Sequence, residues 1–299
     1  MNSSRILVSG VSGPIGAALL PSLTARGYKV VRLVRGAASR EGQIPWDPAQ
    51  PLAPNSVSGF DAVIHLAGET VVGRWTATKK VRIRDSRVLG TRNLSQALAQ
   101  SPQRPRVLIT ASAVGYYGDR GEEIVRENSP PGTGFLSEVC REWEAATQPA
   151  AAAGIRTAHL RIGLVLSPVG GALQKMLTPF NIGVGGNMGN GRQWWSWIDV
   201  QDLVGAIHHI LQNDRLQGPV NVVAPNPVTN AEFTKTLAGV LSRPAIFPMP
   251  AFAARLVFGQ MADELLLASQ RVEPAKLIAS GYAFQYSNLR QALESILKR

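Results

Sequence analysis

Three glycines at intervals of three residues give the clearest chemical signal in the sequence, in the run Gly10-Val11-Ser12-Gly13-Pro14-Ile15-Gly16. The first glycine permits a tight turn, the second lets the backbone approach a pyrophosphate, and the third lets the next helix pack closely on the preceding strand. The start of that helix offers unpaired amides and a partial positive charge. Because a strand-like run precedes the glycines and a helical run follows, this spacing predicts a dinucleotide-binding turn.

The end of the second expected strand bears on which dinucleotide would bind. An acidic residue there, about 20 residues beyond the glycines, would accept the ribose 2′-hydroxyl and select NAD. The sequence has no acid at this place and reads Val31-Arg32-Leu33-Val34-Arg35-Gly36. Arg35, at the strand exit, could reach a 2′-phosphate, although a solvated strand end is the alternative interpretation. The pattern favours NADP(H) as the cofactor.

The elements that must position this turn follow from hydrophobic periodicity. Short apolar runs alternate with segments of helical period, which predicts an α/β fold of the Rossmann type, a doubly wound parallel sheet with helices on both faces. We expect strands at residues 5–9, 29–34, 61–66, 106–111, 157–162 and 220–223. We expect helices at residues 14–26, 81–100, 135–153 and 230–241.

A change in composition after residue 162 predicts a second, smaller unit. Residues 163–192 are rich in glycine, which is typical of a connection that faces a ligand, and a proline-punctuated, helix-rich tail ends the chain. We therefore expect a cofactor-binding domain at 1–165, to which the helix 198–212 and the strand 220–223 return. The substrate-side subdomain would comprise residues 166–197 and 224–299.

Composition narrows the functional classes. Cys140 is the single cysteine, and the four histidines are scattered, so neither an internal disulfide nor a metal site is expected. No apolar run approaches the roughly 18 residues that cross a bilayer. The net charge of +11 raises nucleic acid or an anionic membrane as partners, but the chain lacks a basic tail and a nucleic-acid-binding motif. We expect a cytoplasmic protein with a small-molecule substrate, no nucleic acid and no membrane partner.

Several polar and aromatic residues have two interpretations each. His65 lies inside an apolar strand and is expected in the core. Asp199 and Asp202 flank the start of a helix, so helix capping is the expected role of both. The aromatic run Trp194-Trp195-Ser196-Trp197 could line a substrate cleft or pack in a core.

Four motifs together give the chain a family resemblance: the glycine turn, residues 61–68, the run Ser112-Ala113-Val114-Gly115-Tyr116-Tyr117-Gly118, and residues 197–202. It resembles an extended short-chain dehydrogenase/reductase, and more narrowly the atypical, sugar-nucleotide epimerase-like branch of the SDR39U type with its C-terminal extension. Residues 44–47, 85–87, 143–146, 161–166 and 258–267 carry the narrower resemblance. Beyond the glycines, the resemblance implies cofactor contacts at Ser12, Pro14, Ile15, Arg35, Leu66, Ala67, Gly68, Arg82, Arg87 and Val165.

The usual catalytic pair of that superfamily is absent. It consists of a tyrosine acid/base and a lysine four residues later, and no lysine here follows a tyrosine at that interval. On the helix where the pair belongs, Leu136 and Cys140 stand in its place. Ser112, Tyr116 and Tyr117 are the candidate substitutes, with structural packing as the alternative. The resemblance implies an NADP(H)-dependent epimerase or oxidoreductase acting on a small molecule such as a nucleotide-linked compound. The alternative is a non-catalytic NADP(H)-binding sensor or regulator.

Overall fold

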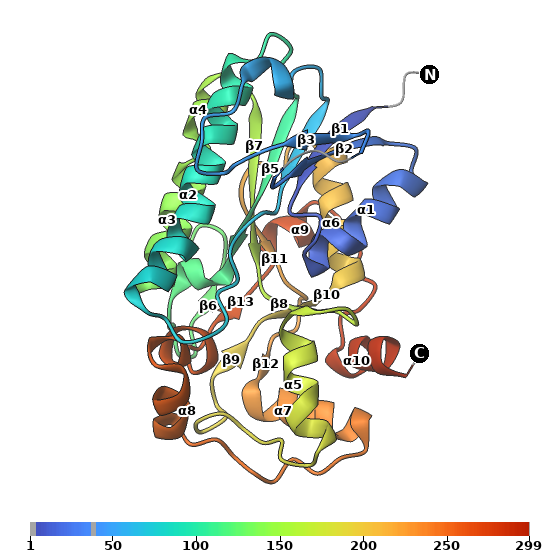
Figure 1. Cartoon of the computed structure of the whole chain (residues 1–299). Coiled ribbons are helices and arrows are strands. Elements are labelled where there is room, and N and C mark those ends of the chain that lie inside the picture. Colours follow the sequence, from blue (N-terminus) through green and yellow to red (C-terminus); the bar gives the residue numbers. More distant parts are fainter. Residues whose placement is uncertain (1–3, 37–39, 299) are drawn as a thin grey trace.

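Seven parallel strands form one sheet in the order β11-β7-β5-β4-β1-β2-β3 (Figure 1). Their bounds are β1 Arg5–Ser9, β2 Lys29–Val34, β3 Gln43–Pro45, β4 Ala62–His65, β5 Val107–Ala113, β7 Arg156–Ile162 and β11 Gly218–Val222. The computed structural model describes residues 4–36 and 40–298; residues 1–3, 37–39 and 299, which the predicted domains include, lie outside it. The strand order reverses between β1 and β4, and in such sheets ligands bind at the carboxyl ends of the strands beside that point. The predicted Rossmann-type fold is confirmed.

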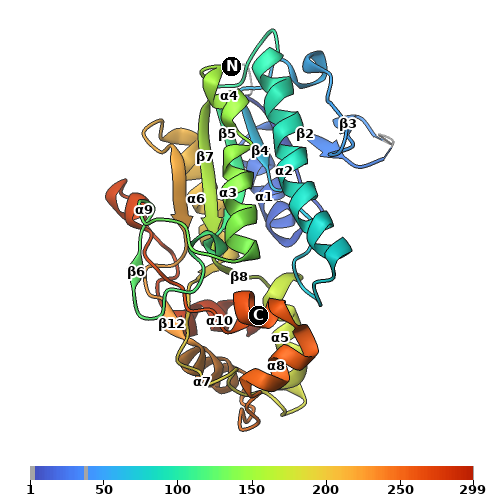
Figure 2. The same ribbon diagram turned by 90° about the vertical axis from the view of Figure 1, so that its left-hand side faces the viewer.

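Helices cover both faces of this sheet. The helices α1 (Pro14–Ala25) and α6 (Val200–Gln212) pack side by side on one face. The other face carries α2 (Ala77–Gln100), α3 (Phe135–Ala145) and α4 (Gln148–Ala152), which lie in front of the sheet in Figure 2. Alternate residues of each strand serve the two faces: Ile6 belongs to the core under α1 and α6, and Leu7 to the core under α2. This two-sided burial explains the nearly continuous apolar runs of the strands.

Two helices differ from the sequence-based expectation. The predicted helix 135–153 is interrupted, and α4 begins after Thr147. In one continuous helix, Pro149 would lack the amide that bonds to the carbonyl of Ala145, and its ring would crowd that carbonyl. The helix α2 starts a turn earlier than predicted, because Thr76 caps it by accepting a hydrogen bond from the amide of Lys79 (3.2 Å).

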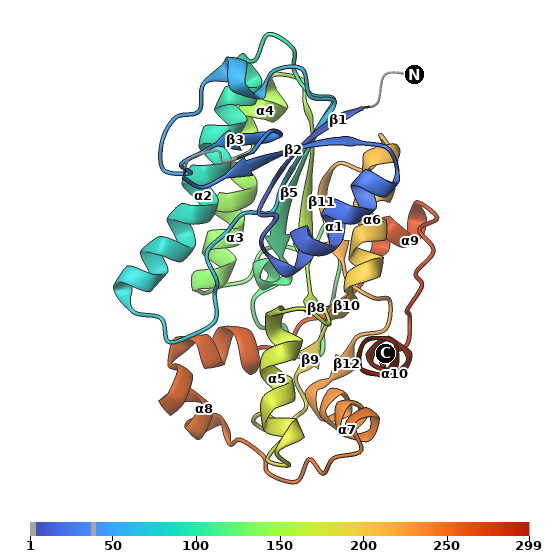
Figure 3. The same cartoon turned by 45° about the vertical axis from the view of Figure 1, so that its right-hand side comes forward.

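A smaller, mainly helical part lies below the sheet and is shown turned in Figure 3. It contains the short strands β8 (Leu164–Leu166), β9 (Trp194–Trp195), β10 (Trp197–Asp199) and β12 (Val228–Thr229) and the helices α5 (Gly171–Asn181), α7 (Asn230–Leu241), α8 (Ala251–Phe258) and α10 (Leu289–Leu297). Its own core includes Trp195, Trp197 and Phe233. The strand β13 (Arg271–Val272) pairs with β6 (Ile124–Val125), and α9 (Ala275–Ala279) packs against β11. Residues 271–279 therefore pack against the domain that contains the seven-stranded sheet, whereas the expected boundaries assigned them to the smaller subdomain.

The two aspartates near the start of α6 have different roles. Asp199 is the N-cap and accepts a hydrogen bond from the amide of Gln201 (2.7 Å), as predicted. The capping role expected for Asp202 is wrong, because its buried carboxylate accepts the amides of Gln285 (2.7 Å) and Tyr286 (2.8 Å). Asp202 thus fastens the C-terminal segment to α6. Within the described parts of the chain, no helix is long and apolar enough to span a bilayer.

Candidate functional site

The glycine turn joins β1 to α1 at the carboxyl edge of the sheet. Gly10 has a positive φ of 73°, and a Cβ placed there would lie 2.5 Å from the carbonyl carbon of Leu66. A Cβ on Gly16 would lie 2.4 Å from the carbonyl oxygen of Gly10. At Gly13 such a Cβ would have one neighbour within 4 Å, that same oxygen at 3.5 Å, so its outer side is open. The first and third glycines are thus required by packing, and the second leaves room for a phosphate group.

A buried pair lies directly beneath this turn. Ser9 and His65 are register partners on β1 and β4, and Ser9 Oγ lies 2.6 Å from His65 Nδ1. The indole ring of Trp46 meets the imidazole edge-on, with 5.5 Å between the ring centroids. Burial lowers the pKa of His65 to about 4, so the ring is neutral at pH 7. The expectation of a core histidine is confirmed.

Cationic side chains gather around the carboxylate of Glu69, just beyond the end of β4. Lys79 Nζ donates a hydrogen bond to Glu69 Oε1 at 2.6 Å. This bond is the largest cause of the lowered pKa of Glu69. The charges of Lys79, Arg82 and Arg35 lower that pKa further, while burial opposes them. Arg35 itself is exposed at the exit of β2, so these cations form an anion-attracting rim beside the turn.

Other residues predicted to contact the cofactor lie close to the same turn. Arg87 Nη1 donates to the carbonyls of Glu69 (2.9 Å) and Ile83 (3.1 Å), and its guanidinium carbon would be 3.2 Å from a Cβ on Gly68. Ser12 is exposed at the turn, and Ile15 packs on the core beneath it. Val165 lies on β8, and the segment after β8 approaches the turn, since a Cβ on Gly170 would lie 3.3 Å from Pro14. The structure therefore brings strand ends, the turn and the start of α2 together around one edge.

The candidate catalytic hydroxyls belong to a buried polar network. Ser112 Oγ donates to Glu144 Oε1 (2.7 Å), and Arg161 donates to both carboxylate oxygens of Glu144 (2.8 Å each). Arg161 Nη1 also donates to the hydroxyl of Tyr117 (3.0 Å), which in turn donates to Asn221 Oδ1 (2.6 Å). Ser112 and Tyr117 are 3% and 0% exposed. Burial raises the pKa of Tyr117 to about 12, so this phenol keeps its proton near neutral pH.

Tyr116 has a different environment from Tyr117. It is half-buried, and the guanidinium of Arg161 lies 3.4 Å from the centroid of its ring. This cation–π contact fixes the ring against the buried network. Its role in catalysis, like those of Ser112 and Tyr117, stays a prediction.

The two positions of the missing catalytic pair are apolar in their surroundings. A Cβ on Gly115 would lie 3.4 Å from Leu136 Cβ and 4.0 Å from Cys140 Sγ, so both face the segment that follows β5. Leu136 packs in a cluster with Trp75 and Met261. Burial raises the pKa of Cys140 to about 12, which keeps its thiol protonated. Neither position offers a group that exchanges a proton near pH 7.

Comparison with known proteins places this geometry in a family. Residues 6–223 match the NAD dependent epimerase/dehydratase family. The chain belongs to this family. Residues 249–296 match a further domain, described as a domain of unknown function (DUF1731).

Similar proteins of this family cover nearly the whole chain. An epimerase family protein of Mycobacterium tuberculosis is 40% identical over 295 residues, which span 98% of this chain and 97% of the relative. The human epimerase family protein SDR39U1 is 36% identical, spanning 98% of this chain and 99% of the relative. A crystal structure of that human protein (isoform 2) with NADPH superimposes with a TM-score of 0.91 at 35% identity, and 99% of each chain is covered.

A nucleoside-diphosphate sugar epimerase from Corynebacterium glutamicum superimposes with a TM-score of 0.83 at 39% identity. The match covers 99% of this chain and 58% of that one. The likeness to the epimerase family of the SDR39U type, inferred above from sequence motifs, is thereby confirmed.

Sequence reasoning did not assign roles to several residues that build this site. The motifs containing Glu144 and Arg161 served only as family markers, and the ion pair between them was not foreseen. Glu69 was also missed, although an acid directly after the small residues 67–68 was a usable signal. Glu264 was missed as well: its carboxylate accepts the amides of Phe135 (3.1 Å) and Leu136 (2.8 Å). The C-terminal domain therefore caps the helix on which the usual catalytic pair would lie.

The tryptophan run divides between core and surface. Trp195 and Trp197 are buried in the core of the smaller part. Trp194 is half-buried, donates to Glu122 Oε2 (2.6 Å), and carries the guanidinium of Arg271 at 4.2 Å from its ring centroid. Of these three tryptophans, Trp194 alone is partly exposed to solvent.

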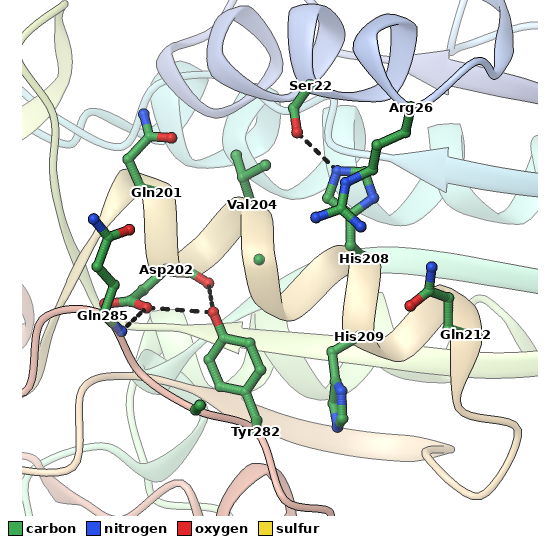
Figure 4. Close-up of a pocket in the computed structure, with 12 residues that line it drawn as sticks. Ser22, Arg26, Gln201, Asp202, Val204, His208, His209, Gln212, Tyr282 and Gln285 are labelled. Carbon is green, nitrogen blue, oxygen red and sulfur yellow. Dashed lines mark hydrogen bonds between the residues drawn. The ribbon is translucent and has the colours of Figure 1, made fainter.

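A separate hollow of about 400 Å³ lies away from this edge, between α1, α6 and the segment around Tyr282 (Figure 4). The hydroxyl of Tyr282 donates to the carbonyl of Asp202 at 2.7 Å. His208 Nε2 lies 2.9 Å from Ser22 Oγ, and burial lowers the pKa of His208 to about 4. The contacts here join the C-terminal segment to the sheet-covering helices. In residues 4–36 and 40–298, no three His, Cys, Asp or Glu side chains are grouped so that they could hold a metal ion.

Proposed function

We propose that this protein binds NADP(H) and exchanges a hydride with a small, nucleotide-linked substrate, as an epimerase or oxidoreductase that works without the Tyr–Lys pair. One observation carries the proposal: the open face of Gly13 lies beside the cationic rim, and the end of β2 carries the exposed Arg35 where an NAD-selecting acid would stand. The first provides space for a pyrophosphate, and the second provides charge for a 2′-phosphate. The human relative crystallised with NADPH supports the same cofactor.

Each part of the site would have a distinct task in holding the cofactor. The amides of the first turn of α1 would face the pyrophosphate, since such amides have no partner within a helix. Arg35 and Arg82 would pair with the 2′-phosphate, and the backbone from Leu66 to Gly68 would border the adenosine. When bound, the nicotinamide would supply or accept the hydride. Leu136 and Cys140 would keep water away from that end of the site.

The hydroxyls of Ser112 and Tyr117 would position neighbouring groups in this scheme. Each already donates its proton to an acceptor in the protein, Glu144 and Asn221 respectively. A hydroxyl in such a bond must break it before it can donate to a substrate, and Tyr117 is fully buried. We therefore propose that neither of these hydroxyls transfers the proton of the reaction.

Fluorescence titration of NADPH and NADH tests the cofactor assignment. The wild-type protein should bind NADPH more tightly, and Arg35→Gln should weaken NADPH binding by about tenfold with little effect on NADH, because one charge-assisted contact is lost. Arg32→Gln, on the same strand, is the matched control and should leave both affinities unchanged. Stronger binding of NADH by the wild-type protein would refute the assignment.

A second candidate function, a non-catalytic NADP(H) sensor, is favoured by the internally satisfied network around Arg161. The two candidates differ in whether a hydride is transferred. NADPH labelled at the transferable hydride, incubated with the protein and a metabolite extract, should yield a labelled metabolite if the protein is an enzyme. Tight NADPH binding without any labelled product would favour the sensor.

A further inference from the structure

An unusually apolar surface covers the outer side of α8. Phe252 and Leu256 are 73% and 74% exposed and lie one turn apart. Helical geometry places them opposite Ala254, which is fully buried, and Phe258, which packs against the cluster around Leu136. The helix is thus apolar on both sides, and one of these sides faces solvent.

Two neighbouring connections extend this surface. Ile246 and Phe247, just before α8, are 72% and 56% exposed. The amide of Phe247 donates to the carbonyl of Gly185 (3.1 Å), which joins this connection to the segment after α5. There Ile182 and Val184 are also exposed. We call these six residues the apolar end: Ile182, Val184, Ile246, Phe247, Phe252 and Leu256.

The helices α5 and α8, which the apolar end adjoins, lie in the lower part of the molecule in Figure 1, below the seven-stranded sheet. The helix α5 separates it from the cofactor turn: Gly170, before α5, approaches Pro14, whereas Ile182 follows the end of α5. An occupant of the apolar end would therefore leave the glycine turn uncovered. Contiguous apolar surface of this kind on a folded protein marks an interaction site.

Basic residues outnumber acidic ones around the apolar end. Residues 166–198 and 233–262 contain no Asp or Glu, and their charged residues are Lys175, Arg192, Lys235, Arg243 and Arg255. Lys175 and Arg243 are exposed, and in the described parts of the chain neither forms an ion pair. Arg255 is bound to Asp263 at 2.8 Å. The whole chain carries a net charge of +11.

We propose that the apolar end docks on an anionic lipid bilayer, with Phe252, Leu256 and Phe247 inserted at the level of the headgroups. Exposed aromatic and aliphatic side chains beside the basic residues Lys175 and Arg243, which have no ion pair within the described residues, match the interface of an anionic membrane. A second copy of this chain would bring the same positive charge to the contact, which disfavours self-association. The proposal departs from the expectation of no membrane partner, which rested on the absence of a spanning segment and of a basic tail.

Vesicle flotation tests this proposal on the full chain. Wild-type protein should float with vesicles of phosphatidylcholine and phosphatidylglycerol in equal parts, and should stay behind with vesicles of phosphatidylcholine alone. The double variant Phe252→Ser/Leu256→Ser should reduce the partition coefficient by about tenfold or more, because two inserted side chains are lost. The control Ile124→Ser/Ile278→Ser removes two apolar side chains that are 48% and 50% exposed outside the apolar end, and it should float like the wild type.

A second pair of variants tests the charge. Lys175→Gln/Arg243→Gln should weaken flotation, and added salt should weaken that of the wild type. All folded variants should retain the wild-type affinity for NADPH, which serves as the control for folding. The flotation test does not depend on the proposed function, because it measures membrane binding whether or not the wild type binds NADPH.

Three results would overturn the proposal. They are failure of the wild type to float with the anionic vesicles, equal loss in the Ile124→Ser/Ile278→Ser control, and a dimer in sedimentation velocity that Phe252→Ser/Leu256→Ser converts to a monomer. The last would show that the apolar end is an interface between two copies of this chain.

Discussion

The two ends of the candidate site differ in how far the protein satisfies its own polar groups. At the cofactor end, the turn around Gly13 leaves an open face, and Arg35 is exposed to solvent. At the reaction end, Ser112, Tyr117, Glu144 and Arg161 form a closed set of hydrogen bonds. The cofactor end therefore has polar groups available for a ligand, whereas the polar groups of the reaction end are already hydrogen-bonded to one another.

Under the proposed function, this difference separates cofactor binding from chemistry within one fold. An exposed cation such as Arg35 gains free energy when an anion arrives, although Lys79 in the same rim is already paired with Glu69. A closed buried network gains nothing by opening, and a single missing partner leaves an uncompensated polar group. The four experiments below test that contrast.

The largest effect is expected from breaking the buried ion pair at the reaction end. Glu144→Gln would leave the guanidinium of Arg161 buried without its countercharge, since their side chains are 12% and 3% exposed. The free energy of unfolding should fall by about 3–5 kcal/mol, measured by urea denaturation. The control Glu142→Gln, on the same helix, removes the exposed pair with Arg84 and should lower it by only ~0–1 kcal/mol. Similar losses of unfolding free energy in Glu144→Gln and Glu142→Gln would contradict the view that the reaction end depends on its closed network.

Acid should destabilise the cofactor end through His65. Burial holds its pKa at about 4 in the folded protein, against 6.5 for a free histidine. The unfolded chain therefore takes up a proton at this residue more readily as the pH falls from 6.5 to 4, and the contribution of His65 to the free energy of unfolding should drop by up to about 3 kcal/mol over that range, beside that of His208. Stability curves of His65→Asn should be flatter between these pH values, measured by urea denaturation. An unchanged slope would rule out His65 as the titrating group.

A methyl group at the open glycine should block the ligand while sparing the fold. In Gly13→Ala the new Cβ meets only the carbonyl oxygen of Gly10, at 3.5 Å, so thermal unfolding should change little. NADPH affinity should fall by up to about a hundredfold, because the pyrophosphate would have to move away from the backbone. Gly27→Ala, at the other end of α1, has no atom within 4 Å of its Cβ; its φ of 81° means that the variant loses some stability, but it should keep full NADPH affinity. Retained NADPH binding by Gly13→Ala would move the pyrophosphate site elsewhere.

The smallest effect concerns the carboxylate inside the cationic rim. Glu69→Gln would release Lys79 and remove a negative charge beside Arg82, so NADPH should bind about three- to fivefold more tightly. NADH affinity should stay the same, because NADH lacks the 2′-phosphate. The titration should be done at low salt, where exposed charges are least screened. Equal weakening of both cofactors would instead show that Glu69 binds a group common to them.

Much of the fold and of the cofactor end could be predicted from the sequence. The strand runs, the glycine spacing and the absent acid near Arg35 all act within one strand–turn–helix unit, so local order along the chain suffices to interpret them. The missing catalytic pair is also a local feature, because Leu136 and Cys140 belong to one helix. Even the break before Pro149 had a local signal, since a proline removes a helical hydrogen bond.

The closed network could not be predicted in the same way. Ser112, Tyr117, Glu144, Arg161 and Asn221 come from separate elements, and only the parallel pairing of β5, β7 and β11 brings them together. The role of Asp202 was misjudged for the same reason, because its partners Gln285 and Tyr286 lie about eighty residues away. The sequence by itself determined the sheet, the phosphate turn and the loss of the usual pair. Tertiary structure alone decided which hydroxyls are already hydrogen-bonded within the protein, because distant segments of the chain supply the partners of a buried polar group.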